Sequence, residues 1–428
     1  MQPGPSARRE GVASTHVQAA WCLYDWANSA FPTVIVTFVF SSYFAGAVAP
    51  DPTTGTAQWG NAVAISALLI GIVSPLAGAI ADATGRRKPW LLAFSITCAV
   101  LTASLWFVRP SAADVPLALV IFVLANTAFE IGTVFYNAML PGLVPPARIG
   151  RLSGWGWGLG YAGGLACLVV VLVVFVQADP PPFGLDKSQA EHVRAAAPLV
   201  ALWMAIFAVP IFVFVPDAPA TGVGLVTATR QGLSTLIGTI RHIRSFRGIG
   251  RFLFAQLLYI DGLNTLFAFG GIYAAGTFGM QTEEIIQFGI ALNVAAGLGA
   301  AAFAWIDDWI GAKRTVLIAL GAIMALGVPL LLVHDKIWFW ALAVALGTFF
   351  GPAQAASRSL MGRLAPPEMR AEMFGLFALS GRITSFLGPA TLAWATAAFA
   401  SQRVGMATVL VFLAAGFVLL WPVKDAPR

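Results

Sequence analysis

The chain carries a series of apolar stretches of about 20 residues, the length that a helix needs to cross the hydrocarbon core of a bilayer. Only 10% of its 428 residues are charged, whereas a soluble domain ordinarily has about a quarter. Backbone groups in lipid must be paired within their own segment, and the alternating ten-residue pattern of barrel strands is absent. The sequence therefore predicts an all-α membrane protein.

We expect twelve transmembrane helices, with bounds good to about two to four residues. The predicted spans are 16–44, 58–81, 89–108, 115–140, 153–177, 197–216, 249–277, 285–306, 315–333, 337–358, 373–397 and 404–422.

The basic residues predict the orientation of these helices. Eighteen of the 25 lysines and arginines fall on the side of the termini, five fall on the opposite side, and Arg358 and Arg382 lie within spans. Short loops rich in lysine and arginine remain cytoplasmic, so both termini should be cytoplasmic. Because these residues are spread over loops rather than gathered in one patch, we expect no nucleic-acid partner. The cysteines lie inside spans without metal-ligand spacing, so we expect no metal and no cofactor.

The two halves of the chain repeat three motifs in the same order. The separations between copies are 236, 226 and 221 residues. The pairs are Asp25–Phe31 with Asp261–Phe267, Asp82–Arg87 with Asp308–Arg314, and Leu143–Pro146 with Leu364–Pro367. Such a repeat predicts two pseudo-symmetric six-helix bundles related by an axis along the membrane normal. We place them at residues 1–216 and 249–428.

The segment 217–248 between the bundles is too polar to span. Its apolar residues recur at helical spacing with arginines nearby, which suits a helix on an anionic membrane surface. A plain solvated linker is the alternative. The apolar residues are Leu233, Leu236, Ile237, Ile240 and Ile243, and the arginines are Arg230, Arg241 and Arg244.

Ionisable side chains inside a span are costly unless paired or hydrated, so they are functional candidates. Five fall in predicted spans: Asp25, Glu130, Asp261, Arg358 and Arg382. A carboxylate and an arginine at similar depth would stabilise each other, and a proton or solute could compete for the pair. Either arginine could instead be a permanent structural partner of Glu130 or Asp261.

Polar residues accompany these charges at helical spacing. Asn28 and Ser29 share a face with Asp25, and Pro32 is expected to bend that helix. The repeat places Asn264 and Thr265 equivalently beside Asp261, and Asn137 lies on the stripe of Glu130. These carboxylates could bind an ammonium group or a proton, or they could merely cap helix ends.

A glycine-rich run, Gly154–Gly164, contains the spacing G-x-G-x-x-G. A dinucleotide site would need a strand before it and an acidic residue after it, and neither is present. The run therefore predicts close helix packing through small residues.

Four stretches of the chain resemble motifs of known transporters. The stretch Gly78–Lys88 resembles the signature of the major facilitator superfamily between helices 2 and 3, and Asp308–Arg314 resembles its second-half copy, although Ala83 replaces a usual basic residue. Leu23–Phe31 resembles the first-helix signature of the vacuole effluxer family, which includes the fungal autophagy-related vacuolar amino-acid exporter. Residues of the predicted spans 10 and 11 resemble a further signature of that family: Ser357–Leu360, Glu372, Phe374, Gly375, Gly381 and Phe386–Pro389.

This resemblance implies the major facilitator fold, in which helices 1 and 7 line a central cavity and Asp25 would face Asp261. It also implies that the two loop motifs latch the cytoplasmic side shut. The residues expected to act as this gate are Gly78, Asp82, Gly85, Arg86, Arg87, Asp308, Gly311, Lys313 and Arg314. Alternatively, the basic loop residues serve topology only.

The leading hypothesis is a secondary transporter, not an enzyme, that moves an amino acid or similar zwitterion by alternating access, with protons as a possible coupling ion. Its partners would be the lipid bilayer and a small solute, and we expect a monomer in a bacterial inner membrane. Asp25 or Asp261 would bind the ammonium group, and Arg358 or Arg382 the carboxylate. The alternatives are a lipid-modifying enzyme using Asp307–Asp308, and a receptor or lipid scramblase on a carrier scaffold.

Overall fold

The computed structural model of the protein describes residues 12–241 and 247–424. Within these ranges the chain is built from helices and connecting turns, and eleven helices are long and apolar enough to cross a membrane. The prediction of an all-α membrane protein is confirmed.

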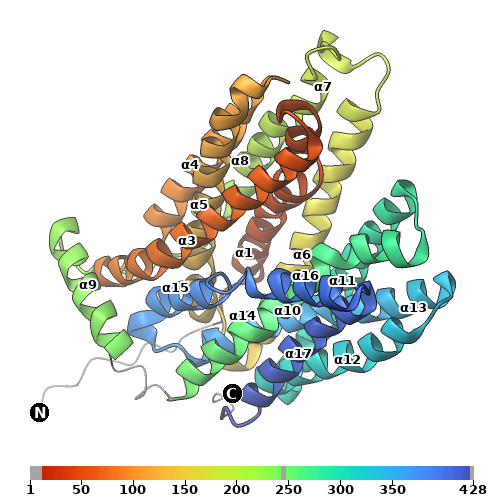
Figure 1. The fold of residues 1–428 in the computed structure, drawn as a ribbon. Coiled ribbons are helices and arrows are strands. Elements are labelled where there is room, and N and C mark those ends of the chain that lie inside the picture. Colours follow the sequence, from red (N-terminus) through yellow and green to blue (C-terminus); the bar gives the residue numbers. More distant parts are fainter. Residues whose placement is uncertain (1–11, 242–246, 425–428) are drawn as a thin grey trace, which may run out of the picture.

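The first half forms one bundle (Figure 1). Its helices are α1 (Thr15–Asn28), η1 (Phe31–Phe38), α2 (Phe40–Tyr43), η2 (Phe44–Val48), α3 (Pro52–Thr84), α4 (Lys88–Ser104), η3 (Leu105–Phe107), η4 (Ala112–Asp114), α5 (Val115–Met139), η5 (Leu140–Gly142), η6 (Pro146–Arg148), α6 (Ile149–Val170), η7 (Val171–Val176), η8 (Pro182–Gly184), α7 (Glu191–Arg194) and α8 (Ala196–Phe214). The first span changes from α-helix to the wider π-helix at Phe31, next to Pro32, where the backbone was expected to deviate.

The second half forms the other bundle. Its helices are α10 (Arg247–Phe278), α11 (Thr282–Ile310), α12 (Ala312–Leu332), α13 (Lys336–Gly347), α14 (Phe350–Leu364), η9 (Pro367–Met369), α15 (Arg370–Ser380), α16 (Leu387–Phe399) and α17 (Gln402–Leu420).

The eleventh predicted span differs from the expectation of one continuous helix over 373–397. The structure divides it into α15 and α16, which are joined by turns at residues 381–386. Gly381 and the hydroxyl residues that follow it are weak helix formers. Asp261 of α10 compensates part of the break, because its carboxylate accepts the backbone N–H of Gly388 in the first turn of α16.

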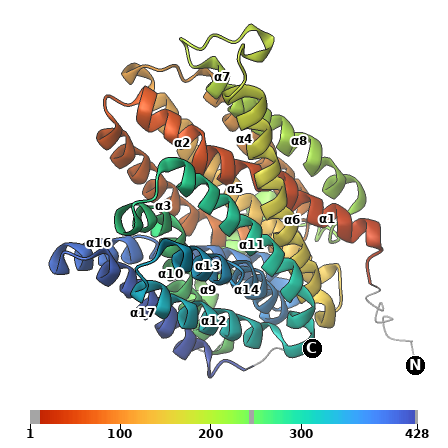
Figure 2. The ribbon, with the colours of Figure 1, turned by 90° about the vertical axis from the view of Figure 1, so that its right-hand side faces the viewer.

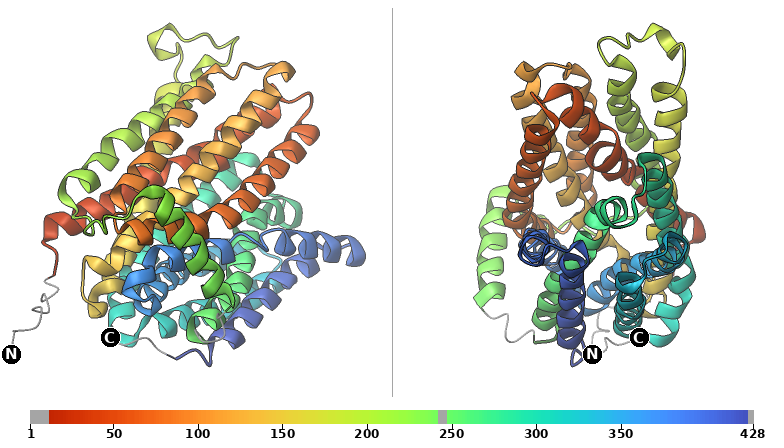
Figure 3. Two further views of the ribbon diagram at one scale, coloured as in Figure 1. Left: turned by 90° about the vertical axis from the view of Figure 1, so that its left-hand side faces the viewer. Right: turned by 45° about the vertical axis from the view of Figure 1, so that its right-hand side comes forward.

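The two bundles meet most closely at the end of the molecule that carries Ala13 and Val423, here called the terminal end. There α6 of the first half packs along α11, and α3 packs along α15. Figures 2 and 3 show the bundles inclined to each other above this junction. The contacts that join the halves therefore gather on one side.

The segment between the bundles contains helix α9 (Leu225–Arg241), which packs against α3 at the terminal end. Gly232 lies directly on the backbone of Ala79 and Ile80. Leu236 is buried, whereas Leu233 and Ile237 are exposed. Residues 225–241 are thus helical, while contact of α9 with lipid and the alternative of a solvated linker both stay predictions. Ile243 and Arg244 lie outside the described residues, as do the side chains of Ile240 and Arg241.

Candidate functional site

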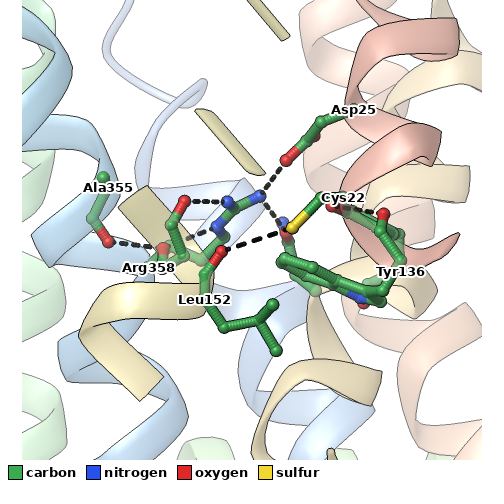
Figure 4. Close-up of polar contacts among 9 residues, drawn as sticks. Cys22, Asp25, Tyr136, Leu152, Ala355 and Arg358 are labelled. Atoms are coloured by element: carbon green, nitrogen blue, oxygen red, sulfur yellow. Dashed lines mark hydrogen bonds and ion pairs between the residues drawn. The ribbon is translucent and has the colours of Figure 1, made fainter. Parts of the chain in front are cut away.

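The charged group that joins the two halves most intimately is Arg358 on α14. Its Nη1 lies 3.0 Å from Oδ2 of Asp25 on α1 and 3.4 Å from Oδ1 of Asn137 on α5. Its Nε donates to Ser153 Oγ at 2.9 Å, and its Nη2 donates to the Ser153 carbonyl at 2.6 Å. One arginine of the second half therefore binds three helices of the first half (Figure 4).

Aromatic rings surround the same guanidinium. Its central carbon lies 5.0 Å from the ring centre of Trp21, 5.7 Å from Tyr136 and 5.6 Å from Trp157. Trp21 and Tyr136 stack at 4.4 Å, and each donates a hydrogen bond to the backbone carbonyl of the other. Cation–π attraction grows when water is excluded. The Arg358 side chain is only 4% exposed and that of Asp25 is 15% exposed, so the guanidinium is buried and the carboxylate is partly buried.

Gly156 on α6 is the residue that leaves room for this pair. A Cβ at that position would lie 2.5 Å from Asp25 Oδ2 and 2.8 Å from Arg358 Nη2. The neighbouring glycines serve the predicted close packing: Gly154 and Gly158 lie against small residues of α11, and Gly160 lies against Ser29 of α1.

The other polar residues near Asp25 point elsewhere. Asn28 is buried and lines an apolar cavity of about 170 Å³ between α1, α4 and α8. Ser29 sits beside Gly160. The structure thus brings Asp25 and Asn137 together with Arg358, and it keeps Asn28 and Ser29 out of that cluster.

A second ion pair joins the halves between Glu130 on α5 and Arg382 in the break between α15 and α16. The Glu130 side chain is 14% exposed and that of Arg382 is 33% exposed. This pair is therefore wetter than the Asp25–Arg358 pair, and a solute or ion can displace it at lower cost.

Asp261 has a different environment from either pair. It is 1% exposed, and its Oδ2 accepts the Gly388 amide at 3.0 Å. Its Oδ1 and the Thr265 hydroxyl are both buried without a hydrogen-bond partner among the described residues. Asn264, one turn along, is partly exposed. No lysine or arginine in the described part of the chain forms an ion pair with Asp261.

At the terminal end, the first loop motif touches the second half. Asp82 Oδ1 lies 3.2 Å from Arg87, and its Oδ2 accepts the backbone N–H of Glu372 in the first turn of α15 at 2.8 Å. Gly78 lies directly on the backbone of Ala371, where a side chain would clash. A carboxylate at a helix N-terminus is favoured by the helix dipole. The Asp82 motif therefore joins α3 to α15.

The second loop motif makes the equivalent contact in the opposite direction, from the second half to the first. Asp308 lies beside the backbone N–H groups of Gly150 and Arg151 at the start of α6, 3.1 Å from Arg363 and 3.6 Å from the Arg151 side chain. Asp307 lies 2.5 Å from Arg363, whose side chain is 3% exposed.

The remaining gate candidates lie beside these contacts. Gly85 and Gly311 have positive φ angles of 81° and 102° where the backbone turns into the next segment. Arg86 lies 3.8 Å from Asp217. Lys313 and Arg314 lie in the first turn of α12.

Sequence reasoning missed several of these partners. Asp217 accepts the Arg87 and Lys88 amides and so ties the start of α4 to the segment after α8. Ser153 directly precedes the glycine-rich run Gly154–Gly164, which predicts only close helix packing. Arg363 lies five residues beyond the predicted end of its span at residue 358, whereas α14 continues to Leu364. The available signal was that Arg363 follows Arg358 by five residues, close enough to belong to the same helix.

Comparisons with known proteins agree with this geometry. The chain is 26% identical over 415 residues to an uncharacterised MFS-type transporter, YxiO, of Bacillus subtilis, covering 95% of this chain and 94% of that protein. It is 24% identical to autophagy-related protein 22-1 of Neosartorya fischeri, covering 99% and 83%.

Solved structures show the same fold. The proton:xylose symporter XylE superposes with a TM-score of 0.73 at 14% identity, covering 96% of each chain. The fucose:proton symporter FucP of E. coli gives 0.73 at 13% identity, covering 96% of this chain and 98% of that one. The family described as "Vacuole effluxer Atg22 like" matches residues 61–426. This chain therefore belongs to the Atg22-like vacuole effluxer family, a group of transporters with the major facilitator fold.

Proposed function

We propose that the protein is a secondary transporter that moves a small zwitterion, most simply an amino acid, by alternating access. The observation that carries the proposal is the Asp25–Arg358 pair, which lies between the two halves with its guanidinium buried. An amino acid offers a carboxylate to Arg358 and an ammonium group to Asp25, so it can replace both partners at once. Binding of the solute then replaces a contact that holds the two halves together.

The terminal-end contacts would act as the gate of this cycle. Asp82 accepts a backbone N–H at the start of α15, and Asp308 forms an ion pair with Arg151 at the start of α6, each across the boundary between halves. Both contacts must break before solute can leave toward the terminal end. We propose that this end faces the cytoplasm, because short loops rich in basic residues remain on that side, and that the membrane is a bacterial inner membrane.

Protons are the proposed coupling ion, with Asp261 as their site. The predicted spans contain three carboxylates and two arginines, and both arginines pair with other carboxylates. Asp261 is left as a buried carboxylate with a free oxygen. Burying an unpaired anion is costly, so a proton is the simplest compensation. The names of the XylE and FucP structures describe proton symporters, which supports the proposal.

Flux of radiolabelled amino acids into proteoliposomes, measured with and without a pH gradient, tests this function. A thermal-shift screen of amino acids and related metabolites across pH selects the solutes. We expect one class of solute to stabilise the protein and to be transported, and Asp25→Asn to lose both effects. If no amino acid binds or moves, and Asp25→Asn leaves transport of other solutes unchanged, the zwitterion proposal is wrong.

The same experiment separates the alternatives. Binding without flux would indicate a sensor on a carrier scaffold. The hypothesis of a lipid-modifying enzyme requires Asp307 and Asp308 to form a metal–diphosphate site. Both carboxylates instead form ion pairs with Arg363. Metal-dependent turnover of a lipid that is lost in Asp308→Ala would favour the enzyme.

A further inference from the structure

A second buried carboxylate lies far from the central pairs, at the start of α15. Glu372 is 0% exposed, and neither of its carboxylate oxygens has a hydrogen-bond partner of good geometry among the described residues. The Thr239 hydroxyl of α9 is the uncharged polar group that faces it. A carboxylate in such a place is an unusual choice for a purely structural position.

Among the described residues, the charged side chain that acts on Glu372 has the wrong sign. Asp82 of α3 faces it and already accepts the Glu372 backbone N–H, so two carboxylates share one helix N-terminus. Arg87 is bonded to Asp82 and not to Glu372. The described parts of α5, α10 and α14, which also pack against α15, present no charged side chain to Glu372. An ionised Glu372 would therefore be buried beside a like charge.

Three separate parts of the protein enclose this carboxyl group. Gly78 of α3 lies on the Ala371–Glu372 backbone, which leaves no gap between the halves at this point. Gly232 of α9 lies on Ala79 and Ile80 of α3, so the linker helix covers the same junction. Any separation of α3 from α15 at the terminal end exposes Glu372 to water.

We propose that Glu372 is a proton-binding site that senses the state of the terminal end. It carries a proton while α3 and α15 are in contact, and it releases that proton to water on the terminal side when they separate. The site is distinct from Asp261, although its role rests on the alternating access proposed above. Opening toward the terminal side is then favoured by higher pH on that side.

Infrared spectroscopy of the full-length protein in nanodiscs tests the proton directly. At neutral pH, we expect the wild type to show a carboxylic-acid C=O band that Glu372→Gln lacks and that the control Glu368→Gln retains. Glu368 is an exposed carboxylate four residues earlier. Asp261→Asn should remove a different band, so the two sites can fail independently. Identical spectra for wild type and Glu372→Gln would overturn the proposal.

A distance measurement tests the coupling to opening. Spin labels on Ala147→Cys and Lys424→Cys, both exposed and one on each half, report separation of the terminal end. The three native cysteines are buried. In the wild type, release of one proton predicts that the open-to-closed ratio rises by up to about tenfold per pH unit. Glu372→Gln should stay closed at every pH, and Glu368→Gln should follow the wild type.

The stability of the variant provides a third readout. A glutamine has the charge and shape of a protonated glutamate, so Glu372→Gln should be as thermostable as the wild type at neutral pH. A pH response equal to that of the wild type, or a large loss of thermostability, would each show that Glu372 is not a proton site.

Discussion

Asp25 and Asp261 occupy equivalent places in the two halves, yet they have different partners. Asp25 pairs with Arg358, whereas Asp261 accepts a backbone amide and has one oxygen left free. The repeat explains the difference. Arg358 and Asn137 are separated by 221 residues, the same offset as between Leu143–Pro146 and Leu364–Pro367, which follow them. The first half therefore carries an amide where the second half carries a guanidinium. The structure even places these two equivalents in contact.

Under the proposed function, this asymmetry would give the two aspartates different roles. A pair of opposite charges can bind a zwitterion, and a lone carboxylate can bind a proton. A symmetric protein would have two copies of one site rather than one of each.

Removing Arg358 should produce the largest effect. Arg358→Gln leaves Asp25, whose side chain is 15% exposed, without its cation, and the cost of about 3–5 kcal/mol for losing one partner of a fully buried ion pair sets the upper bound. We expect a large fall in the free energy of unfolding in detergent and no transport. The double variant Asp25→Asn/Arg358→Gln should be less destabilised than the sum of its single variants. Additive effects would show that the pair is not coupled.

Crowding the same pair should have the next largest effect. Gly156→Ala places a methyl group against Asp25 and Arg358, and overpacking of this kind costs about 1–3 kcal/mol. Gly60→Ala is the matched control, because a Cβ there meets nothing within 4 Å. Thermal unfolding should separate the two variants, and equal melting temperatures would contradict the close contact at Gly156.

The Glu130–Arg382 pair should contribute less than the Asp25–Arg358 pair. One third of the Arg382 side chain is exposed, so we expect Arg382→Gln to cost about 1 kcal/mol or less. The effect should shrink at high salt, and the charge swap Glu130→Arg/Arg382→Glu should restore part of it. An effect of Arg382→Gln as large as that of Arg358→Gln would remove the distinction between the two pairs.

Asp261→Asn should have the smallest effect on stability. Asparagine keeps the oxygen that accepts the Gly388 amide, so the cost should be less than about 1 kcal/mol. Transport should lose its dependence on a pH gradient while solute binding remains. Retention of proton-driven accumulation in this variant would assign the proton to another group.

Much of the fold could be predicted from the sequence, because span length, loop charge and the internal repeat are local or periodic properties. The break in the eleventh span could not, since it depends on Asp261, which lies more than 100 residues away and supports the start of α16. Propensity alone at Gly381 is too weak to end a helix in lipid.

The candidate site could be predicted as a set of residues but not as a set of partners. Asp25, Glu130, Asn137, Arg358 and Arg382 stood out because charge and amide groups are rare in spans. The alternatives considered for a fixed structural partner of Arg358 were Glu130 and Asp261, and the structure pairs it with Asp25. Helix rotation and depth decide such pairing, and neither can be read from a single chain. Ser153 and Gly156 gave no separate signal.

The seam between α6 and α11 has a consequence for movement. Gly154 and Gly158 meet Ala300, Ala301, Ala304 and Gly297, so backbone and methyl groups form the contact at these positions, next to the edge-to-face pair of Trp155 and Trp305. Surfaces without long interlocking side chains can roll over each other with little repacking. We therefore expect a few polar bonds between the halves to set the energy barrier to their relative movement. Single substitutions in these bonds would then shift the equilibrium between conformations without blocking the movement.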